Sequence, residues 1–190
     1  SNPYAKYSGK LKTIKDGYDK IIDIEYCGFN DQNTYTPVYD RPQIPKIKNL
    51  LNAPVSLVKS ITTNMPLKES NHRMKTEYKY KGGILHTEGK GFLGFSELEQ
   101  KDNHNNIAKS YYSVNGDYYI PYLTKNISQN NTSIISENEL TYNIRNISGK
   151  RYELTLNKQI NYDRLNGNTT VTTFSDYQYG KPKLINKDFG

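Results

Sequence analysis

Turn dipeptides that favour a left-handed backbone recur along this 190-residue chain and divide it into short segments. The clearest are Asp16-Gly17, Asn115-Gly116 and Asn166-Gly167, and each stands between segments in which apolar and polar residues alternate. Asp-Gly and Asn-Gly supply the positive φ angles that tight hairpin turns need. Short strands at this spacing, separated by such turns, predict an all-β fold of consecutive antiparallel hairpins that form a curved sheet.

Strand-like segments account for most of the sequence. The expected strands are 11–14, 21–26, 55–62, 75–80, 84–87, 92–99, 109–114, 118–123, 139–144, 152–162 and 169–179. Gly82-Gly83 is expected to form the turn between two of them. The best helix candidate, 47–51, is too short to define an architecture. We expect the proline-containing stretch 30–54 to be a long irregular connection across the sheet surface. The Asn- and Ser-rich stretch 124–138 is expected to be a second connection.

The side chains available for burial fit a sheet better than a helical bundle. The chain has 18 Tyr, no Trp and only 34% hydrophobic residues. Tyr buries its ring while its hydroxyl stays in water. Tyr, Thr, Ile and Val all suit a pleated, half-buried surface.

The charge of the chain does not indicate a nucleic-acid site. The net charge is +7, but the lysines are dispersed and no Arg-rich run occurs. Scattered lysines also keep sheets soluble and protect their edges. We therefore expect no nucleic-acid partner, and a basic nucleic-acid-binding domain stays the weakest of three alternatives. No apolar run approaches the roughly 20 residues of a membrane span.

The residues that carry chemistry are few and scattered. Cys27 is the only cysteine, so an internal disulfide and a thiolate zinc cluster are excluded, and we expect a structural thiol. The histidines (His72, His86 and His104) lack metal-type spacing. The acidic residues beside predicted turns (Asp16, Asp102 and Asp163) are expected to stabilise the local backbone. We expect no catalytic residue, no metal and no cofactor.

One motif imitates a nucleotide-binding loop. Gly89, Gly91 and Gly94 match Gly-x-Gly-x-x-Gly. In a dinucleotide-binding fold this loop follows a strand and opens a helix. Here the residues that follow, 95–100, form no helix pattern. Glycines within a strand instead mark bulges, and we expect Phe92 and Phe95 to anchor that bend by burying their rings.

The same residues resemble a known family. A Tyr-x-Tyr strand followed by Gly-Lys-Gly-Phe-Leu-Gly-Phe resembles the middle segment of Tc-toxin B subunits and virulence-plasmid B-type proteins. The residues that carry the resemblance are Tyr78, Tyr80, Gly89, Gly91, Phe92, Gly94 and Phe95. Lys90 stands where that family usually has Arg. The resemblance is most specific over 76–97 and weakens after 125.

The resemblance implies a structural role. It suggests a Tc-toxin B middle-like β segment over 1–125 and a hairpin extension over 126–190 that leads into YD-like repeats. The segment would form part of an RHS-like β-shell that encloses a toxic C-terminal region of a large secreted or cell-surface protein. The implied partners are the remaining propeller and repeat segments of the same protein, with a toxin-complex subunit as a further candidate. The alternative is a carbohydrate- or cell-surface-binding β-module.

A weak internal repeat points the same way. Tyr7 to Gly17 resembles Tyr179 to Gly190, and a third copy is expected at Tyr78 to Ile84. Each copy is expected to be a Tyr-bearing strand, a Gly turn and a return strand. Such units stack because one unit cannot bury its own face. No signal peptide is visible at the start. We therefore expect the chain to begin and end within a longer protein, with at least one open strand edge near its ends.

Overall fold

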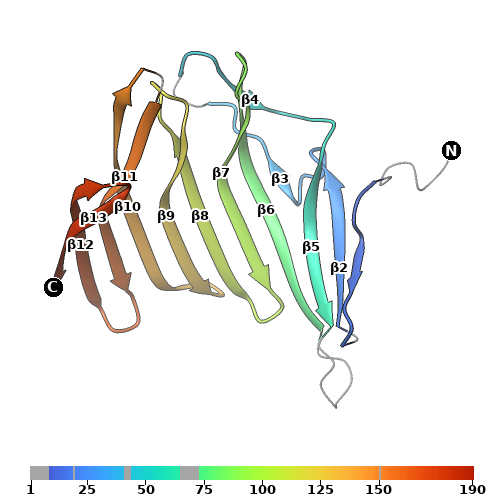
Figure 1. Ribbon diagram of the computed structural model, residues 1–190. Helices are drawn as coiled ribbons and strands as arrows, with labels where there is room; N and C mark the ends of the chain where they lie inside the picture. The colour runs from blue at the N-terminus through green and yellow to red at the C-terminus, as the bar shows by residue number, and fades with distance from the viewer. Residues whose placement is uncertain (1–8, 19, 41–43, 65–72, 150) are drawn as a thin grey trace.

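The computed structural model describes residues 9–18, 20–40, 44–64, 73–149 and 151–190. About 71% of these residues lie in strands, and none of them lies in a helix, so the all-β prediction is confirmed. One curved sheet contains every strand (Figure 1). The strands are β1 Thr13–Lys15, β2 Ile21–Gly28, β3 Tyr35–Thr36, β4 Ile47–Leu50, β5 Ser56–Asn64, β6 Arg73–His86, β7 Gly91–Asp102, β8 Asn106–Val114, β9 Pro121–Asn130, β10 Ser133–Ser148, β11 Arg151–Asp163, β12 Asn168–Gln178 and β13 Lys181–Phe189.

The sheet is built almost entirely of neighbours in sequence. Its order is β1-β2-β5-β6-β7-β8-β9-β10-β11-β12-β13, and each adjacent pair is antiparallel. Turns with side-chain caps close several hairpins. Asp16 Oδ1 accepts the backbone N–H groups of Tyr18 and Lys20, and Asp102 and Asp163 cap their turns in the same way. The role expected for these three carboxylates is confirmed.

The stretch 30–54 differs from the prediction. Most of its described residues are irregular, as expected, but two short strands within it, β3 and β4, join the sheet beside the upper half of β6. β5 pairs only with the lower half of β6, 73–77, which leaves the upper edge of β6 open for them. The helix candidate 47–51 is therefore wrong: 47–50 form an antiparallel strand whose Ile47 faces His86. Hydrogen bonding of residues 47–50 to the unpaired backbone groups at this strand edge outweighs their weak preference for a helix.

Two further stretches, one expected to be a connection and the other a turn, form strands instead. The stretch 124–138 is not a connection, because β9 and β10 run through it with a short turn at 131–132. Gly82-Gly83 is not a turn either: β6 continues through it, and the hairpin turns at 87–90. The expected third repeat copy at 78–84 is therefore part of one continuous strand. The last copy does form a hairpin, β12–β13, which turns at Tyr179-Gly180. The first copy lies partly outside the described residues.

The described part of the chain forms a single layer with a small core. The accessible surface is 13037 Å², whereas a compact monomer of this mass exposes about 9,300 Å². The buried hydrophobic cluster lies at one corner, where the loop after β2 meets β5 and β6, and consists of Cys27, Phe29, Tyr35 and Leu57. Sheets normally bury one face against a second layer, and here no second layer covers either face within the described residues.

Both lateral edges of the sheet are open. β1 pairs only with β2, and β13 pairs only with β12, as far as the described residues go. β13 is exposed over most of its length, with Leu184, Ile185 and Phe189 about half exposed or more. Unpaired backbone groups along such an edge favour pairing with a further strand.

Candidate functional site

The motif predicted from the sequence forms one hairpin, β6–β7, with its turn at 87–90. It brings some of the predicted residues together. The ring of Phe95 lies 4.8 Å from that of Tyr80 and 5.1 Å from that of Phe92. Phe95 and Tyr80 pack against the buried cluster. The expectation that Phe92 buries its ring is wrong, since its side chain is half exposed. Tyr78 lies opposite Gln100, away from this cluster.

The glycines of the motif serve the backbone rather than a phosphate. Gly89, Gly91 and Gly94 all have positive φ, Gly89 within the turn and the other two within β7. The register shifts beside them: Ile84 faces Gly94, whereas Leu85 faces Phe92, so that Leu93 is the extra residue of a bulge. The predicted bulge is confirmed. The strand then continues to Asp102 in place of the helix that a dinucleotide loop requires.

A residue that the sequence did not single out holds this corner together. Tyr35 is 1% exposed, and its hydroxyl donates to the carbonyl oxygen of Leu50 and accepts the N–H of Gly83 at 3.1 Å. A Cβ on Gly83 would lie 3.1 Å from that hydroxyl oxygen. The absence of a side chain at Gly83 therefore lets the Tyr35 hydroxyl approach the backbone of β6 closely. Through its two hydrogen bonds, Tyr35 on β3 contacts both β4 and β6.

The rim beside the motif turn is a second contact point. His86 is buried, its ring lies 4.3 Å from that of Tyr119, and its Nδ1 accepts the N–H groups of Glu88 and Lys90 at 3.3 Å. His86 Nε2 has no hydrogen-bond partner among the described residues. The Lys90 ammonium lies 5.9 Å and 5.5 Å from the ring centres of Tyr119 and Tyr152, respectively, so it joins the motif turn to two later segments.

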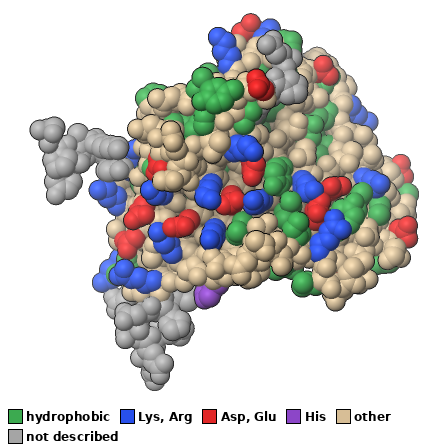
Figure 2. Space-filling model, turned by 180° about the vertical axis from the view of Figure 1, so that it is seen from behind, with side chains coloured by type: hydrophobic (Ala, Val, Ile, Leu, Met, Phe, Trp, Pro, Cys, Tyr) green, Lys and Arg blue, Asp and Glu red, His purple; other side chains and the backbone are tan. Residues whose placement is uncertain are grey.

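One face of the sheet, here called the charged face, collects Lys and Glu from successive strands. Residues that lie opposite each other on neighbouring strands share a face. Figure 2 shows positive and negative side chains interspersed over the face that it presents. Three registered rows define the charged face: Lys81, Glu97, Tyr111, Lys125, Glu139, Ile160 and Val171; Lys79, Glu99, Lys109, Ile127, Glu137, Tyr162 and Thr169; Glu77, Lys101, Ile107, Gln129 and Ile134.

Ion pairs join neighbouring strands on the charged face. Glu99 lies 3.2 Å from Lys79 and 3.1 Å from Lys109. Burial raises the pKa of Glu99, but hydrogen bonds from these two lysines outweigh burial and leave the pKa lowered. On β10, the hydrogen bond from Lys125 is the main cause of the lowered pKa of Glu137.

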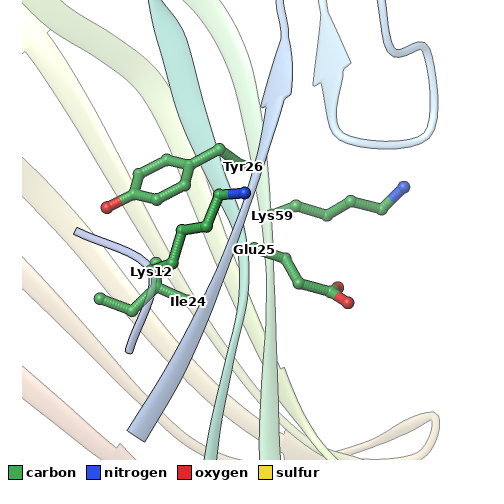
Figure 3. A pocket seen from close by; sticks show the side chains of 5 residues that line it. All are labelled: Lys12, Ile24, Glu25, Tyr26 and Lys59. Carbon is green, nitrogen blue, oxygen red and sulfur yellow. The ribbon is translucent and has the colours of Figure 1, made fainter. Parts of the chain in front are cut away.

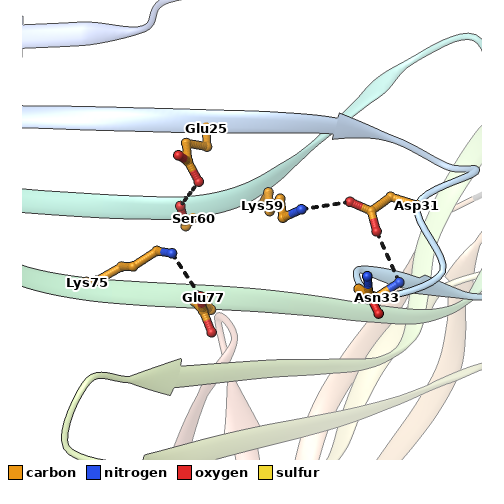
Figure 4. A network of polar contacts seen from close by, with 7 residues as sticks. All are labelled: Glu25, Asp31, Asn33, Lys59, Ser60, Lys75 and Glu77. Carbon is orange, nitrogen blue, oxygen red and sulfur yellow. Dashed lines mark hydrogen bonds and ion pairs between the residues drawn. The ribbon is translucent and has the colours of Figure 1, made fainter.

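Polar contacts of other kinds stabilise the charged face over β2, β5 and β6 (Figure 4). Ser60 donates to Glu25 at 2.7 Å, and Lys75 pairs with Glu77 at 2.9 Å. Lys59 reaches Asp31 at 3.0 Å, in the loop that leads to the buried corner. Here a serine stands between two carboxylates of one row, Glu25 and Glu77, and the lysine that pairs with Glu77 lies on the same strand.

The opposite face, here called the uncharged face, carries amides, hydroxyls and tyrosines. Its rows are Tyr80, Leu98, Ser110, Asn126, Asn138, Asn161 and Thr170; Tyr78, Gln100, Ala108, Ser128, Ser136, Asp163 and Asn168; Thr76, Asp102, Asn106, Asn130 and Ser133. Lys, Arg and Glu are absent from these rows. The two carboxylates, Asp102 and Asp163, are the last residues of β7 and β11, where they accept backbone N–H groups of their own turns. Polar side chains also pair across strands, as Ser110 does with Asn126 at 2.8 Å.

The hollows of the surface do not gather reactive groups. One of about 390 Å³ is lined by Lys12, Ile24, Glu25, Tyr26 and Lys59. Figure 3 shows Ile24 and Tyr26 on one side of the strand and Glu25 and Lys59 on the other, so these groups do not converge on a ligand. Within the described residues, no group of three His, Cys, Asp or Glu side chains is placed to hold a metal ion. The same residues contain no helix long and apolar enough to cross a membrane.

The buried ionisable groups have structural surroundings. Burial raises the pKa of the Cys27 thiol, which keeps it in the unreactive protonated form, as expected for a structural cysteine. Burial also raises the pKa of Tyr80 to about 12, and its hydroxyl donates to the carbonyl oxygen of Val58 at 2.9 Å. Both residues therefore support packing at the buried corner.

Comparison with known proteins agrees with the predicted resemblance. The model of the family described as insecticide toxin TcdB middle/N-terminal region matches residues 2–126. Among solved structures, the crystal structure of TcdB2-TccC3-TEV is similar in fold, with a TM-score of 0.61 and 12% sequence identity over 92% of this chain. This chain spans 12% of the length of that chain. A search of curated proteins finds no match.

Proposed function

Because this chain belongs to the family of the insecticide toxin TcdB middle/N-terminal region, we propose that it is a non-catalytic structural segment of a large toxin-type protein. The segment contributes strands to a β-shell that encloses a toxic region of the same polypeptide. It acts through its shape and its edges rather than through a reactive site. The parent protein is secreted or displayed at the cell surface.

The observation that carries this proposal is the incomplete sheet. A single layer whose first and last strands each lack one neighbour among the described residues is suited to continue into further strands. Residues 126–190 support the same role, since β10 to β13 extend the sheet beyond the family match as two more hairpins. We propose that they lead into repeats of the RHS or YD type.

The partners that follow from this role are the other segments of the parent protein. The propeller and repeat strands would pair with the open edges of β1 and β13. A second subunit of the toxin complex is a further partner, since the similar structure holds TcdB2 together with TccC3. Nucleic acid and small cofactors have no part in this role.

Lengthening the chain tests the proposal. The sequence of the parent protein would be extended by one hairpin at each end, and thermal unfolding would be compared with that of the present chain. The melting temperature should rise, because each added hairpin buries a face that its neighbour leaves open. A chain lengthened by flexible Gly/Ser tails of equal length is the control. If the natural extension melts no higher than the tailed chain, a self-contained binding module becomes the better account.

A further inference from the structure

The uncharged face and the charged face of this sheet differ in the desolvation free energy that covering them with protein would cost. The ion pairs of the charged face keep partial access to water, and the side chain of Lys79, for example, is 62% exposed. Removing water from paired charges costs more than their mutual attraction returns unless every group is bonded again. The charged face is therefore suited to stay in solvent.

The uncharged face has the opposite property. Its amides and hydroxyls each donate and accept hydrogen bonds, so they can exchange water for protein groups without stranding a charge. Its tyrosines bury rings and keep hydroxyls for bonding. The next row on this face, Leu140, Gln159 and Thr172, ends at Lys187 on the edge strand β13. Inside that edge, a wall of this composition exerts little attraction or repulsion on the charges of a neighbouring chain.

Resting on the proposed shell function, we infer that the uncharged face lines the interior of the shell and meets the enclosed part of the same polypeptide, while the charged face points to bulk solvent. The excess accessible surface of the single layer is consistent with one face being covered in the parent protein. The enclosed chain is in contact with neutral polar groups and is held without charge pairing.

Adjacent residues on two strands allow a direct test. On β8, Ser110 lies on the uncharged face and its neighbour Lys109 on the charged face; on β9, Ser128 and Gln129 form the same kind of pair. Each residue would be changed singly to cysteine in the full-length protein, in a Cys27→Ala background. The probe is a maleimide that carries a long polyethylene glycol chain, and labelling at each position is followed by peptide mass spectrometry. The same proteins labelled in urea give the unprotected rate.

We expect Ser110→Cys and Ser128→Cys to label about tenfold or more slowly in the native protein than in urea, as cysteines behind a rarely opened wall do. Lys109→Cys and Gln129→Cys should label close to the urea rate. Protection of Lys109→Cys and Gln129→Cys, whether or not the uncharged-face cysteines are also protected, would overturn the inferred orientation. It would not contradict the proposed shell function.

Two other results have separate meanings. Fast labelling at all four positions in the native full-length protein would show that neither face is covered, and it would sink the proposed function together with the orientation. Protection of Ser110→Cys and Ser128→Cys that already occurs in this 190-residue chain, and that grows with its concentration, would identify a second copy as the occupant and would overturn the inference.

Discussion

Replacing Tyr35 by phenylalanine removes one oxygen atom from the best-buried point of the molecule. The change keeps the ring, whose centre lies 4.6 Å from that of Phe29, and deletes the hydroxyl that bonds to the N–H of Gly83 and the carbonyl of Leu50. Each buried polar group left without a partner costs about 1–3 kcal/mol. Two such groups are left here, so Tyr35→Phe should lower the free energy of unfolding by about 2–6 kcal/mol. For a chain of this size, each kcal/mol lowers the melting temperature by about 2–4 °C, so a decrease of about 4–24 °C follows.

A matched variant makes the argument testable. Tyr80→Phe also deletes a tyrosine hydroxyl from the same corner, but this hydroxyl has one bond, to the half-buried strand β5 at Val58. Its cost should be about 0.5–1.5 kcal/mol. Urea unfolding of both variants measures the difference, provided that the unfolding free energy depends on urea concentration with the same slope in both. The reasoning is refuted if Tyr35→Phe costs less than about 0.5 kcal/mol, or if the two variants are equally destabilised.

The remaining predictions concern acid, edges and ligands. The carboxyls of Glu99 and Glu137 have pKa values below the ordinary 4.5, so their contribution to stability is complete above that pH and is lost as the pH falls through the lowered values. The urea concentration at the unfolding midpoint should therefore decrease as the pH is lowered from neutral to about pH 3. Glu137→Gln should make this decrease smaller. An equally large decrease in the variant contradicts the role of Glu137. The lysines of β13, Lys181, Lys183 and Lys187, should oppose edge pairing by repulsion, so self-association measured by sedimentation should be modest and should strengthen with salt; association that weakens with salt would show that attraction between charges drives it. Titration with NAD or ATP should give no saturable thermal shift, because the motif glycines form a bulge in a strand; a clear shift would overturn that interpretation. Binding to an oligonucleotide should be weak and should disappear steeply with salt, and salt-resistant retention would restore the nucleic-acid alternative.

The hairpin pattern could be predicted because its causes are local. Alternation of residue types and turn chemistry fix β1–β2, β11–β12 and the strand β7 within a few residues. The errors arose where the deciding contact is distant in sequence. Gly82-Gly83 has the composition of a turn, but Gly83 is small because Tyr35, 48 residues earlier, packs against it. Residues 47–50 pair with a strand edge that exists only because β5 leaves β6 early.

The two faces of the sheet have a signal in the sequence, which is the alternation of charge along single strands. Residues 75–81 alternate strictly between charged and uncharged side chains, and so do residues 97–101. Because side chains in a strand alternate between faces, this pattern alone assigns the charges to one side. The Asn- and Ser-rich stretch 124–138 has the composition of a connection, because these residues are common in loops. In the sheet they satisfy one another across strands, as Asn130 does with Asn106.

The register shifts of this sheet set a rule for how its sequence can change length. One extra residue lies at Leu93, and others lie where the pairing slips between Tyr111 and Tyr112, between Ile134 and Ser136, and between Thr141 and Tyr142. Each extra residue reverses the parity of the positions beyond it. A single-residue deletion inside a strand would carry lysines to the uncharged side and asparagines to the other. Natural insertions and deletions in relatives should therefore fall in the turns, or occur within strands as compensated pairs.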